Sequence, residues 1–433
     1  MRKRSNGTAL PRMIALLFVS AVCTVTASAQ SPTRPTTRTV TVPPSSVGKS
    51  TEAGIKVHTN VRLLGAQGVS GTTQTYGPPA PGYLFETPAS LACIYSLQPA
   101  TAGCNPNVVS VNPVGGSHAI AIVDAYDYAV ADADLQAFVT QFGITAITPS
   151  SFEVVYAPTG STTTPGGCVG PATRPPSSAG TGWDIEEALD IEYAHAMAPQ
   201  AKLYLVEAQS NYNSDLYCAV SLASKLVEKE GGGQVSMSWG GGEFQGETVV
   251  DCVFTGHNVV YYAATGDSPG TIYPSVSPNV IAVGGTTLSS NLNTGEFTYE
   301  STWQDAGGGS SQYEARPAYQ NGIAYTVGSQ RGVPDFSAVA NPNTGVWVYN
   351  STYEPPYVWW LVGGTSLATP LSAGIANELG HFAPSSYAEL SRIYAQPFHF
   401  RDTTFGNCGI YIASLAGPGW DFCTGWGSPQ GYK

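Results

Sequence analysis

The residues best suited to chemistry begin at Gly363, in the run GGTSLATPLSAG that ends at Gly374. Ser366 follows a glycine-rich turn there and lies at the start of a predicted helix. A serine in this position exposes its hydroxyl and leaves backbone N–H groups free to meet a developing negative charge. An isolated Gly-Thr-Ser would favour an ordinary helix N-cap, but the longer pattern G-T-S-x-x-x-P-x-x-A-G is far more specific than that tripeptide.

A second group of candidate residues lies in the run WDIEEALDIE, which begins at Trp183. Glu186 and Asp190 are four positions apart, so a helix places both carboxylates on one face, about one turn apart. An acidic helix usually faces solvent. This helix precedes an apolar strand and itself carries four apolar residues, Ile185, Ala188, Leu189 and Ile191. We therefore expect the helix to pack against a sheet.

A third candidate is Asp267, in the run ATGDS that begins at Ala264 and follows an apolar strand. A turn with an Asx cap is a common structural role for Gly-Asp-Ser. The position of Asp267 alone therefore does not distinguish a turn residue from a catalytic carboxyl. Its interpretation depends on the runs that contain Ser366 and Glu186.

Together these runs resemble the sedolisin (serine-carboxyl peptidase) family, which shares the motif around Ser366 with subtilisins. Subtilisins need a histidine base oriented by an aspartate, but none of the six histidines lies in a subtilisin-like H-G-T-H-V run. His195 and His257 are expected to be structural, with His257 starting a buried strand. Asp124, at the end of the first predicted strand, would be the subtilisin-like aspartate. Without a histidine it is expected to be a satisfied loop or strand-end carboxylate.

The resemblance implies a catalytic role for each of four residues. Ser366 corresponds to the nucleophile, and Glu186 corresponds to the base that replaces histidine. Asp190 would orient Glu186 by sharing a proton with it, as close carboxyl pairs must. Asp267 corresponds to the carboxyl of the oxyanion hole.

The resemblance also implies a strand edge that lines the substrate, formed by Ser238, Trp239 and Gly240. The implied activity is that of a secreted, acid-active endopeptidase, because Asp267 can donate a hydrogen bond only while it is protonated. Its partners would be protein or peptide substrates. The alternatives are tripeptidyl-peptidase specificity on the same mechanism, an inactive binding protein on the same fold, and an exported structural protein with chance motifs.

A calcium site is expected near the C-terminus. The residues at 402–403 and the run GPGWD at 417–421 combine two carboxylates with glycine turns, and Ca²⁺ prefers such an all-oxygen shell. A surface turn is the alternative. The pattern resembles the C-terminal calcium site of sedolisins, which implies one structural Ca²⁺. Its ligands would be the side chains of Asp402 and Asp421 and the carbonyl oxygens of Thr403, Gly417 and Gly419.

From about Thr87 onwards, apolar strands alternate with helical segments. Strands are expected at 118–125, 152–157, 202–207, 234–239 and 258–264, and helices at 132–142, 184–197, 215–230 and 248–255. A hairpin at 346–349 and 358–362 precedes the helix from Ser366. This alternation implies an α/β fold with a mainly parallel sheet covered by helices on both faces. The resemblance makes it a doubly wound, subtilisin-like peptidase domain over residues 87–433.

The first 86 residues have a different composition. Residues 1–29 combine a basic start, an apolar run and an A-x-A site, which is typical of a secretory signal peptide. Residues 30–86 are rich in Pro, Thr, Ser and Gly and are expected to form a linker, a loosely ordered arm or a short pro-segment. A net charge of −12 with few lysines argues against nucleic acid as a partner. No segment is long enough to span a membrane, so we expect an exported monomer.

Seven cysteines follow the predicted signal peptide, and none forms a C-x-x-C zinc pattern. Disulfides are their expected use in an oxidising compartment. Cys93–Cys104 and Cys408–Cys423 would each close a short loop. Cys218–Cys252 is a further candidate, and the odd number leaves at least one thiol free.

Overall fold

The structure, a computed structural model of the chain, describes residues 39–64, 84–409 and 415–431. All of them belong to one unit, Pro32–Lys433. The predicted signal peptide, residues 1–29, lies outside the described residues, and so does Cys23. No helix among the residues that are described is long and apolar enough to cross a membrane.

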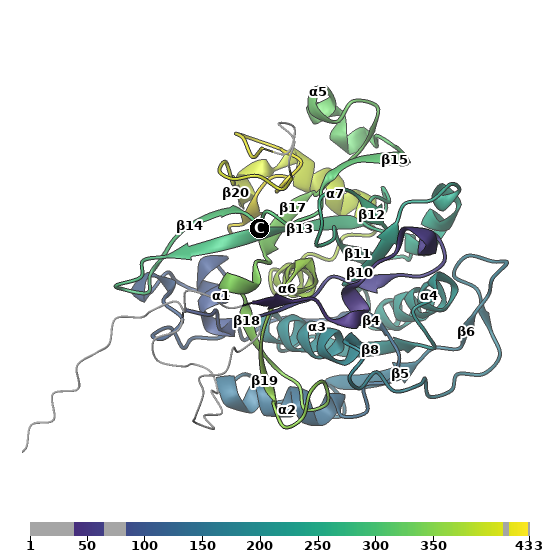
Figure 1. The fold of residues 1–433 in the computed structure, drawn as a ribbon, viewed down its shortest axis with the longest axis horizontal. Helices are drawn as coiled ribbons and strands as arrows, with labels where there is room; N and C mark the ends of the chain where they lie inside the picture. Colours follow the sequence, from purple (N-terminus) through teal and green to yellow (C-terminus); the bar gives the residue numbers. More distant parts are fainter. Residues whose placement is uncertain (1–38, 65–83, 410–414, 432–433) are drawn as a thin grey trace, which may run out of the picture. The chain divides into compact units, whose positions relative to one another are not determined.

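An eight-stranded sheet forms the centre, in the order β14-β13-β11-β9-β4-β8-β5 with β17 paired to β13 (Figure 1). Its strands are β4 Ala119–Ala125, β5 Phe152–Tyr156, β8 Lys202–Ala208, β9 Gly233–Met237, β11 Val259–Ala264, β13 Ile281–Ser290, β14 Phe297–Thr302 and β17 Phe336–Val339. Every pairing is parallel except that of β14 with β13. The prediction of a mainly parallel α/β sheet is confirmed.

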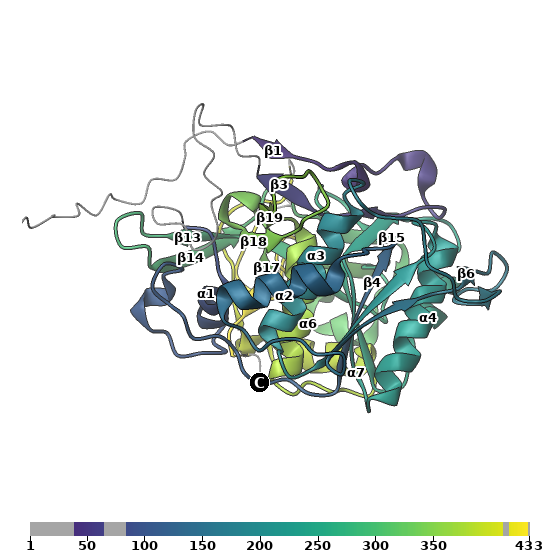
Figure 2. The ribbon, with the colours of Figure 1, turned by 90° about the horizontal axis from the view of Figure 1, so that it is seen from below.

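Helices cover both faces of this sheet (Figure 2). One face carries α2 (Ala131–Phe142), α3 (Trp183–Met197) and α6 (Thr365–Glu378), and the other carries α4 (Asn213–Lys229). Strand β4 shows how the sequence makes this possible. Its Ile120 and Ile122 belong to the core under α3 and α6, whereas Ala121 and Val123 belong to the core under α4. Side chains of a strand alternate between faces, so an entirely apolar strand serves both layers.

Two smaller sheets involve the segment that precedes the main domain. One has the order β12-β10-β2 and the other β1-β3-β19-β18. Their strands are β1 Val40–Thr41, β2 His58–Thr59, β3 Arg62–Leu64, β10 Trp239–Gly242, β12 Ile272–Tyr273, β18 Val346–Tyr349 and β19 Trp359–Gly363. Part of the region expected to be a linker or arm therefore supplies strands to two sheets.

The remaining elements are short. They are α1 Pro88–Ile94, α5 Ala324–Val327, α7 Ser386–Ala395, the pairs β6 Thr159–Gly160 with β7 Cys168–Val169, β15 Gly309–Ala315 with β16 Gln330–Val333 and β20 Phe400–Arg401 with β21 Ser428–Pro429, and the 3₁₀ helices η1 Pro44–Ser46, η2 Ser50–Glu52, η3 Ala102–Cys104, η4 Glu247–Phe254, η5 Ala318–Ile323, η6 Pro342–Thr344 and η7 Pro397–His399.

Two element boundaries differ from the sequence prediction. The helix expected at 248–255 is the 3₁₀ helix η4, and the strand expected at 234–239 leaves the central sheet after Met237. Its continuation, β10, pairs with β2 and β12 instead. Trp239 remains fully buried after the change, with its indole N–H 2.6 Å from the carbonyl oxygen of Val123. The apolar pattern therefore continues although the partner strands change.

Three disulfides link the described cysteines. Cys93–Cys104 and Cys408–Cys423 confirm the two short-loop predictions. The third prediction is wrong, because Cys218 pairs with Cys168, and Cys252 is an exposed free thiol. The Cys168–Cys218 bridge spans 50 positions, a separation at which sequence spacing gives no guide to pairing.

Candidate active site

Ser366 lies at the start of α6, directly after the turn that leaves β19. Gly364 in this turn has φ +107°, which side-chain-bearing residues rarely adopt. A Cβ atom there would also lie 2.0 Å from the carbonyl oxygen of Asn60 and 2.8 Å from Oδ2 of Asp267. The glycine is therefore required because backbone and carboxyl oxygens converge beside Ser366.

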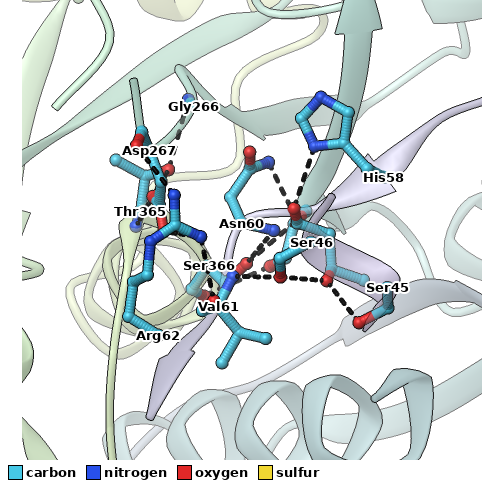
Figure 3. Close-up of polar contacts among 12 residues, drawn as sticks. Ser45, Ser46, His58, Asn60, Val61, Arg62, Gly266, Asp267, Thr365 and Ser366 are labelled. Atoms are coloured by element: carbon cyan, nitrogen blue, oxygen red, sulfur yellow. Dashed lines mark hydrogen bonds and ion pairs between the residues drawn. The ribbon is translucent and has the colours of Figure 1, made fainter. Parts of the chain in front are cut away.

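The polar atoms of Ser366 are all bonded in this structure (Figure 3). Its hydroxyl donates to the carbonyl oxygen of Ser238 at 3.0 Å and accepts from the amide of Asn60 at 3.0 Å. Its own backbone N–H donates to the carbonyl oxygen of Asn60 at 3.1 Å. The side chain is fully buried. A residue of the N-terminal segment thus contacts both the hydroxyl and the backbone amide of the candidate nucleophile.

Pro370 explains a contact of Ser238. A proline has no N–H, so the carbonyl oxygen of Ser366, four positions earlier in α6, lacks its normal helical donor. The hydroxyl of Ser238 lies 3.2 Å from that oxygen and donates to it. The proline of the sequence motif therefore couples α6 to the residue just before β10.

Glu186 reaches the site because α3 and α6 pack closely. A Cβ atom on Gly374 would lie 2.7 Å from the Cβ of Met197, so the glycine of the motif permits this approach. Burial, and then the charge of Asp124, raise the pKa of Glu186 well above its usual value, while the nearby hydroxyls of Ser366 and Thr59 favour its ionised form. Neither of its carboxyl oxygens has a hydrogen-bond partner of normal geometry.

Asp190 contacts Ser238 rather than Glu186. The Ser238 hydroxyl lies 2.8 and 2.7 Å from the two oxygens of the Asp190 carboxyl. Burial raises the pKa of Asp190 well above its usual value, and the charges of Asp124 and Glu186 raise it further. The direct hydrogen bond expected between the two carboxyls is not formed in this arrangement. The carboxyls of Glu186 and Asp190 instead interact through charge.

Asp124 has a larger influence than its sequence context indicated. We expected a satisfied carboxylate, but both of its oxygens are buried without a hydrogen-bond partner. Burial raises its pKa to about 8. Its charge also raises the pKa of Glu186 and of Asp190. The expectation was wrong because α3 packs against β4, so neither solvent nor a hydrogen-bond donor reaches the carboxyl of Asp124.

Asp267 is bound to Thr365, the residue directly before Ser366. Its Oδ1 accepts hydrogen bonds from the amide and the hydroxyl of Thr365, at 2.8 and 2.9 Å. Its buried Oδ2 has no hydrogen-bond partner and lies 3.4 Å from a guanidinium nitrogen of Arg62. Burial raises the pKa of Asp267 to about 6, against the opposing effects of Arg62 and Thr365.

The residues expected to line the substrate are occupied by the N-terminal segment. Trp239 and Gly240 of β10 pair antiparallel with Thr59 and His58. The carbonyl oxygen of Ser238, just before β10, accepts from the side-chain amide of Asn60 at 3.2 Å. Sequence analysis missed this segment, because a Pro/Thr/Ser-rich stretch carries no periodic pattern that would place it in a cleft.

The two histidines considered as bases lie elsewhere. His195 is buried, and its Nε2 bonds the carbonyl oxygen of Thr145 at 2.8 Å, which agrees with a structural role. His257 does not start a buried strand as expected. It is exposed in the loop before β11, where its backbone N–H donates to Glu228.

The residues of the predicted calcium site lie together in the C-terminal loops. The Asp402 carboxyl accepts from the amide of Gly419 at 2.8 Å, and the Asp421 carboxyl accepts from the amide of Gly417 at 2.9 Å. Two carboxylates beside glycine turns fit the oxygen donor set of Ca²⁺. Among the described residues, neither this site nor any other place contains a cluster of three or more His, Cys, Asp or Glu side chains able to hold a metal ion.

Comparison with known proteins places these features in a family. Residues 177–427, more than half of the chain, match the subtilase family. Kumamolisin from Bacillus sp. (strain MN-32) is 32% identical over 298 residues, which cover 60% of this chain and 52% of kumamolisin. Sedolisin from Pseudomonas sp. (strain 101) is 29% identical over 291 residues, which cover 57% of this chain and 47% of sedolisin. The chain thus spans about half the length of these curated relatives.

A solved structure extends the likeness to the whole fold. Pseudomonas sedolisin, a serine-carboxyl proteinase complexed with two molecules of pseudo-iodotyrostatin, superposes with a TM-score of 0.63 at 25% identity. The match covers 80% of this chain and 95% of that chain. The chain therefore belongs to the subtilase family, with the sedolisins as its group within it.

Proposed function

We propose that this protein is a serine-carboxyl endopeptidase that hydrolyses peptide bonds in proteins through an acyl-enzyme on Ser366. One observation carries the proposal: the backbone of Asn60 lies against Ser366, with its N–H 3.0 Å from the Ser366 hydroxyl and its carbonyl oxygen 3.1 Å from the Ser366 amide nitrogen. A carbonyl held by the amide of a serine at a helix start is the arrangement that acyl transfer needs.

The proposed first step transfers a proton from Ser366 to Glu186. The hydroxyl turns from the Ser238 carbonyl to the Glu186 carboxylate as its oxygen attacks the substrate carbonyl carbon. When the C–N bond breaks, Glu186 returns the proton to the leaving amine. Water then hydrolyses the ester on Ser366 by the same proton transfers in reverse. Asp190, placed by the Ser238 hydroxyl, interacts with Glu186 through charge, because the charge of Glu186 raises the pKa of Asp190.

The oxyanion is proposed to be stabilised by the backbone N–H of Ser366 and by Asp267. Thr365 supplies both hydrogen bonds to Oδ1, so Oδ2 is the oxygen that carries the proton and donates it. With the pKa raised to about 6, this carboxyl is neutral in acid and loses its proton near neutral pH. The proposed peptidase is therefore active in acid.

Endopeptidase specificity is favoured over tripeptidyl specificity by the path of the N-terminal segment. The described chain runs on from residue 60 in both directions, back to residue 39 and forward to residue 64. A tripeptidyl-peptidase needs a cleft that ends three residues before the scissile bond. Here more than three residues precede Asn60 without such an end, and three of them, Lys56, Val57 and His58, line the same cavity as Asn60.

Two further features are proposed with this function. One structural Ca²⁺ would be held by Asp402, Asp421 and the carbonyl oxygens of Thr403, Gly417 and Gly419, where it would tie the C-terminal loops together. Secretion, directed by residues 1–29, is supported by three disulfides, which form in oxidising compartments.

Casein hydrolysis from pH 3 to pH 8 tests the function, with the full chain and its Ser366→Ala variant, and with and without a serine-directed inhibitor. We expect acid-soluble peptides from the wild type at pH 3–5, little release at pH 8, and none from Ser366→Ala. Ser372→Ala is the matched control, because it removes another buried hydroxyl of α6 that bonds only the Ala368 carbonyl. Equal hydrolysis by Ser366→Ala, or none by the wild type at any pH, would overturn the proposal in favour of another nucleophile or an inactive binding protein.

A further inference from the structure

A group of four carboxyls takes no part in the proposed mechanism. They belong to Glu243, just after β10, to Glu247 and Asp251 of η4, and to Glu314 of β15. The carboxyls of Glu243 and Glu247 form one hydrogen-bonded pair, and those of Asp251 and Glu314 form another. We call these four residues the carboxyl cluster. It joins three parts of the chain that are far apart in the sequence.

The two most buried members of the cluster lack ordinary donors. Glu247 and Glu314 are 0% and 3% exposed, and the amide of Phe244 donates to Oε2 of Glu247 at 2.8 Å. Among the described residues, no N–H or hydroxyl donates to Oε1 of either side chain. An ionised oxygen buried in this way costs free energy, whereas a protonated carboxyl becomes the donor itself. The geometry therefore fits one proton in each pair, carried by Glu247 towards Glu243 and by Glu314 towards Asp251.

The two pairs influence each other. Burial is the main cause that raises the pKa of Glu247 to about 9 and the pKa of Glu314 to about 8. The charge of Glu314 also raises the pKa of Glu247, and the charge of Glu243 raises that of Glu314. Burial raises the pKa of Asp251 as well. Loss of a proton from one pair is therefore felt by the other.

The elements packed against the cluster offer little charge to balance it. Their titratable groups are Tyr217 of α4, Tyr273 of β12, Tyr319 of η5 and Arg331 of β16. Burial raises the pKa of each tyrosine, so all three stay neutral. Arg331 lowers the pKa of Glu314, but its guanidinium is already paired with Asp335 at 2.6 Å. Ionised carboxyls of the cluster would therefore repel one another with little compensation.

Glu243 connects the cluster to the wall of the candidate active site. Its oxygens accept three hydrogen bonds, from the Ser311 hydroxyl at 2.6 Å, the Gln312 amide at 2.9 Å and the Thr271 hydroxyl. Thr271 follows Asp267 by four positions, and both line a cavity of about 280 Å³. Tyr273 of β12 donates to Asp251 at 3.1 Å. The cluster thus holds β12 and the loop that carries Asp267.

We propose that the carboxyl cluster is a pH-sensitive switch, which ties β10, η4, β12 and β15 together while each pair holds a proton and releases them when both pairs have ionised. The switch concerns the stability of this part of the fold, so it does not depend on the proposed peptidase function. It adds to that function a second acid-dependent element, one that positions the loop of Asp267 without contacting the substrate.

The direction of the pH dependence follows from the protons. An acid whose pKa is raised by folding binds its proton more tightly in the folded state. The stabilising effect of Glu247 and Glu314 is therefore complete below their ordinary pKa of 4.5 and is lost as the pH rises towards 8 and 9. At higher pH each pair consists of two like charges. The folded state should lose stability across the neutral range, first in the elements that the cluster joins.

Glu247→Gln and Glu314→Gln test the switch in the full-length chain. Each amide stays neutral at every pH and can donate to Glu243 or Asp251 as the protonated carboxyl does. Between pH 4 and pH 7 the melting temperature of the wild type should fall further than that of either variant, by about 2 °C or more, and that of the double variant should fall least. At pH 4 the variants should melt close to the wild type. Glu354→Gln, an exposed change between β18 and β19, is the matched control and should fall as the wild type does.

Hydrogen exchange followed by mass spectrometry is a second measurement, and it needs no variant. Rates are first corrected for the intrinsic pH dependence of exchange. In the wild type, the protection of η4 relative to β13 should then fall roughly tenfold or more between pH 5 and pH 8, because one unit of pKa is a factor of ten in the equilibrium. In the double glutamine variant the ratio should stay constant. Both measurements are repeated with Ser366→Ala in each protein, so that self-digestion cannot account for a difference.

Three results would overturn the switch. They are equal falls in melting temperature in the wild type and the glutamine variants, a constant protection ratio in the wild type, and variants destabilised by the same amount at pH 4 and pH 7, which is the behaviour of an ordinary structural contact. Any of these results leaves the peptidase proposal standing, because none depends on casein hydrolysis. Conversely, a chain that hydrolyses no casein but shows the expected melts and exchange would refute the peptidase and retain the switch.

Discussion

Thr365 binds one oxygen of the Asp267 carboxyl twice, with its amide at 2.8 Å and its hydroxyl at 2.9 Å. Both donors act on Oδ1, so this oxygen cannot carry the proton without losing a bond. The proton of the neutral acid is therefore confined to Oδ2, which is buried and has no hydrogen-bond partner. A single residue next to the nucleophile thus fixes which oxygen of Asp267 can donate.

Asp267→Asn should lower peak activity and extend the active range to higher pH. The carboxyl donates only while protonated, and its pKa is raised to about 6, so its contribution is present below pH 6 and lost above it. An asparagine amide donates at every pH but from a slightly different position. Complete loss of an oxyanion donor typically costs ~10²–10³ in rate. Measurement of kcat/KM from pH 2 to pH 8 on one peptide checks both effects.

Asp305→Asn is a control that should move the alkaline limb in the direction opposite to Asp267→Asn. Its exposed carboxylate raises the pKa of Asp267, so removing that charge should shift the alkaline limb slightly to lower pH with peak activity kept. An alkaline limb that stays fixed in both variants would show that another group titrates.

Ser366→Ala and Glu186→Gln should each remove nearly all peptidase activity, by several powers of ten in kcat. Nucleophile and base act as a unit, so the double variant should lose little more than either single variant. Glutamine is close in shape to the neutral form of Glu186 that burial favours, so the fold should be retained. Progress curves on one peptide and thermal melts test this. Losses that add in the double variant would contradict a shared step.

The sequence predicted which residues gather at the candidate site, but it did not predict the contacts that these residues make. Glu186, Asp190, Asp267 and Ser366 stand out because each has a local pattern, a helix spacing or a glycine turn, and the structure places them around one point. Asp124 has no such pattern. Its effect arises only when α3 covers the end of β4, which is a matter of packing between distant segments.

Asp124→Asn should stabilise the protein near neutral pH and leave the acid limb of activity in place. The folded-state pKa of about 8 exceeds the ordinary 3.8, so stability is complete below pH 3.8 and falls as pH rises towards 8. Asparagine removes this loss, which should be at least about 1 kcal/mol. With a pKa of about 8, Asp124 is already neutral in the acid range, so its replacement by asparagine leaves the charge around Glu186 unchanged there.

Thermal melts and kcat/KM profiles from pH 3 to pH 8 measure both consequences of Asp124→Asn. Asp132→Asn, an exposed change in the first turn of α2, is the matched control and should leave both curves in place. Melting temperatures of Asp124→Asn and wild type that fall in parallel between pH 4 and pH 8 would contradict a buried, strained carboxyl.

The fold agrees with the sequence prediction where a buried element leaves a recognisable apolar pattern in the sequence. The strands at β4, β8 and β11 lie within a residue or two of their predicted bounds, because apolar runs of that length between helices have few other uses. The segment at 39–64 has no such trace. Backbone pairing with β10 and β19 fixes it, together with contacts such as Arg62 to Asp267, and none of these depends on a local pattern.

Removal of calcium should lower the melting temperature of the wild type, and Asp421→Ala should abolish that response. A ligand that binds only the folded state stabilises it by about 2.7 kcal/mol at a hundredfold excess over Kd. Asp421 also bonds the amide of Gly417, so its replacement destabilises the loop with or without metal. The informative quantity is therefore the difference between melts with calcium and with chelator. That difference should vanish in Asp421→Ala and in Asp402→Ala and persist in Asp132→Ala. A chelator effect of equal size in all variants would place any bound metal elsewhere.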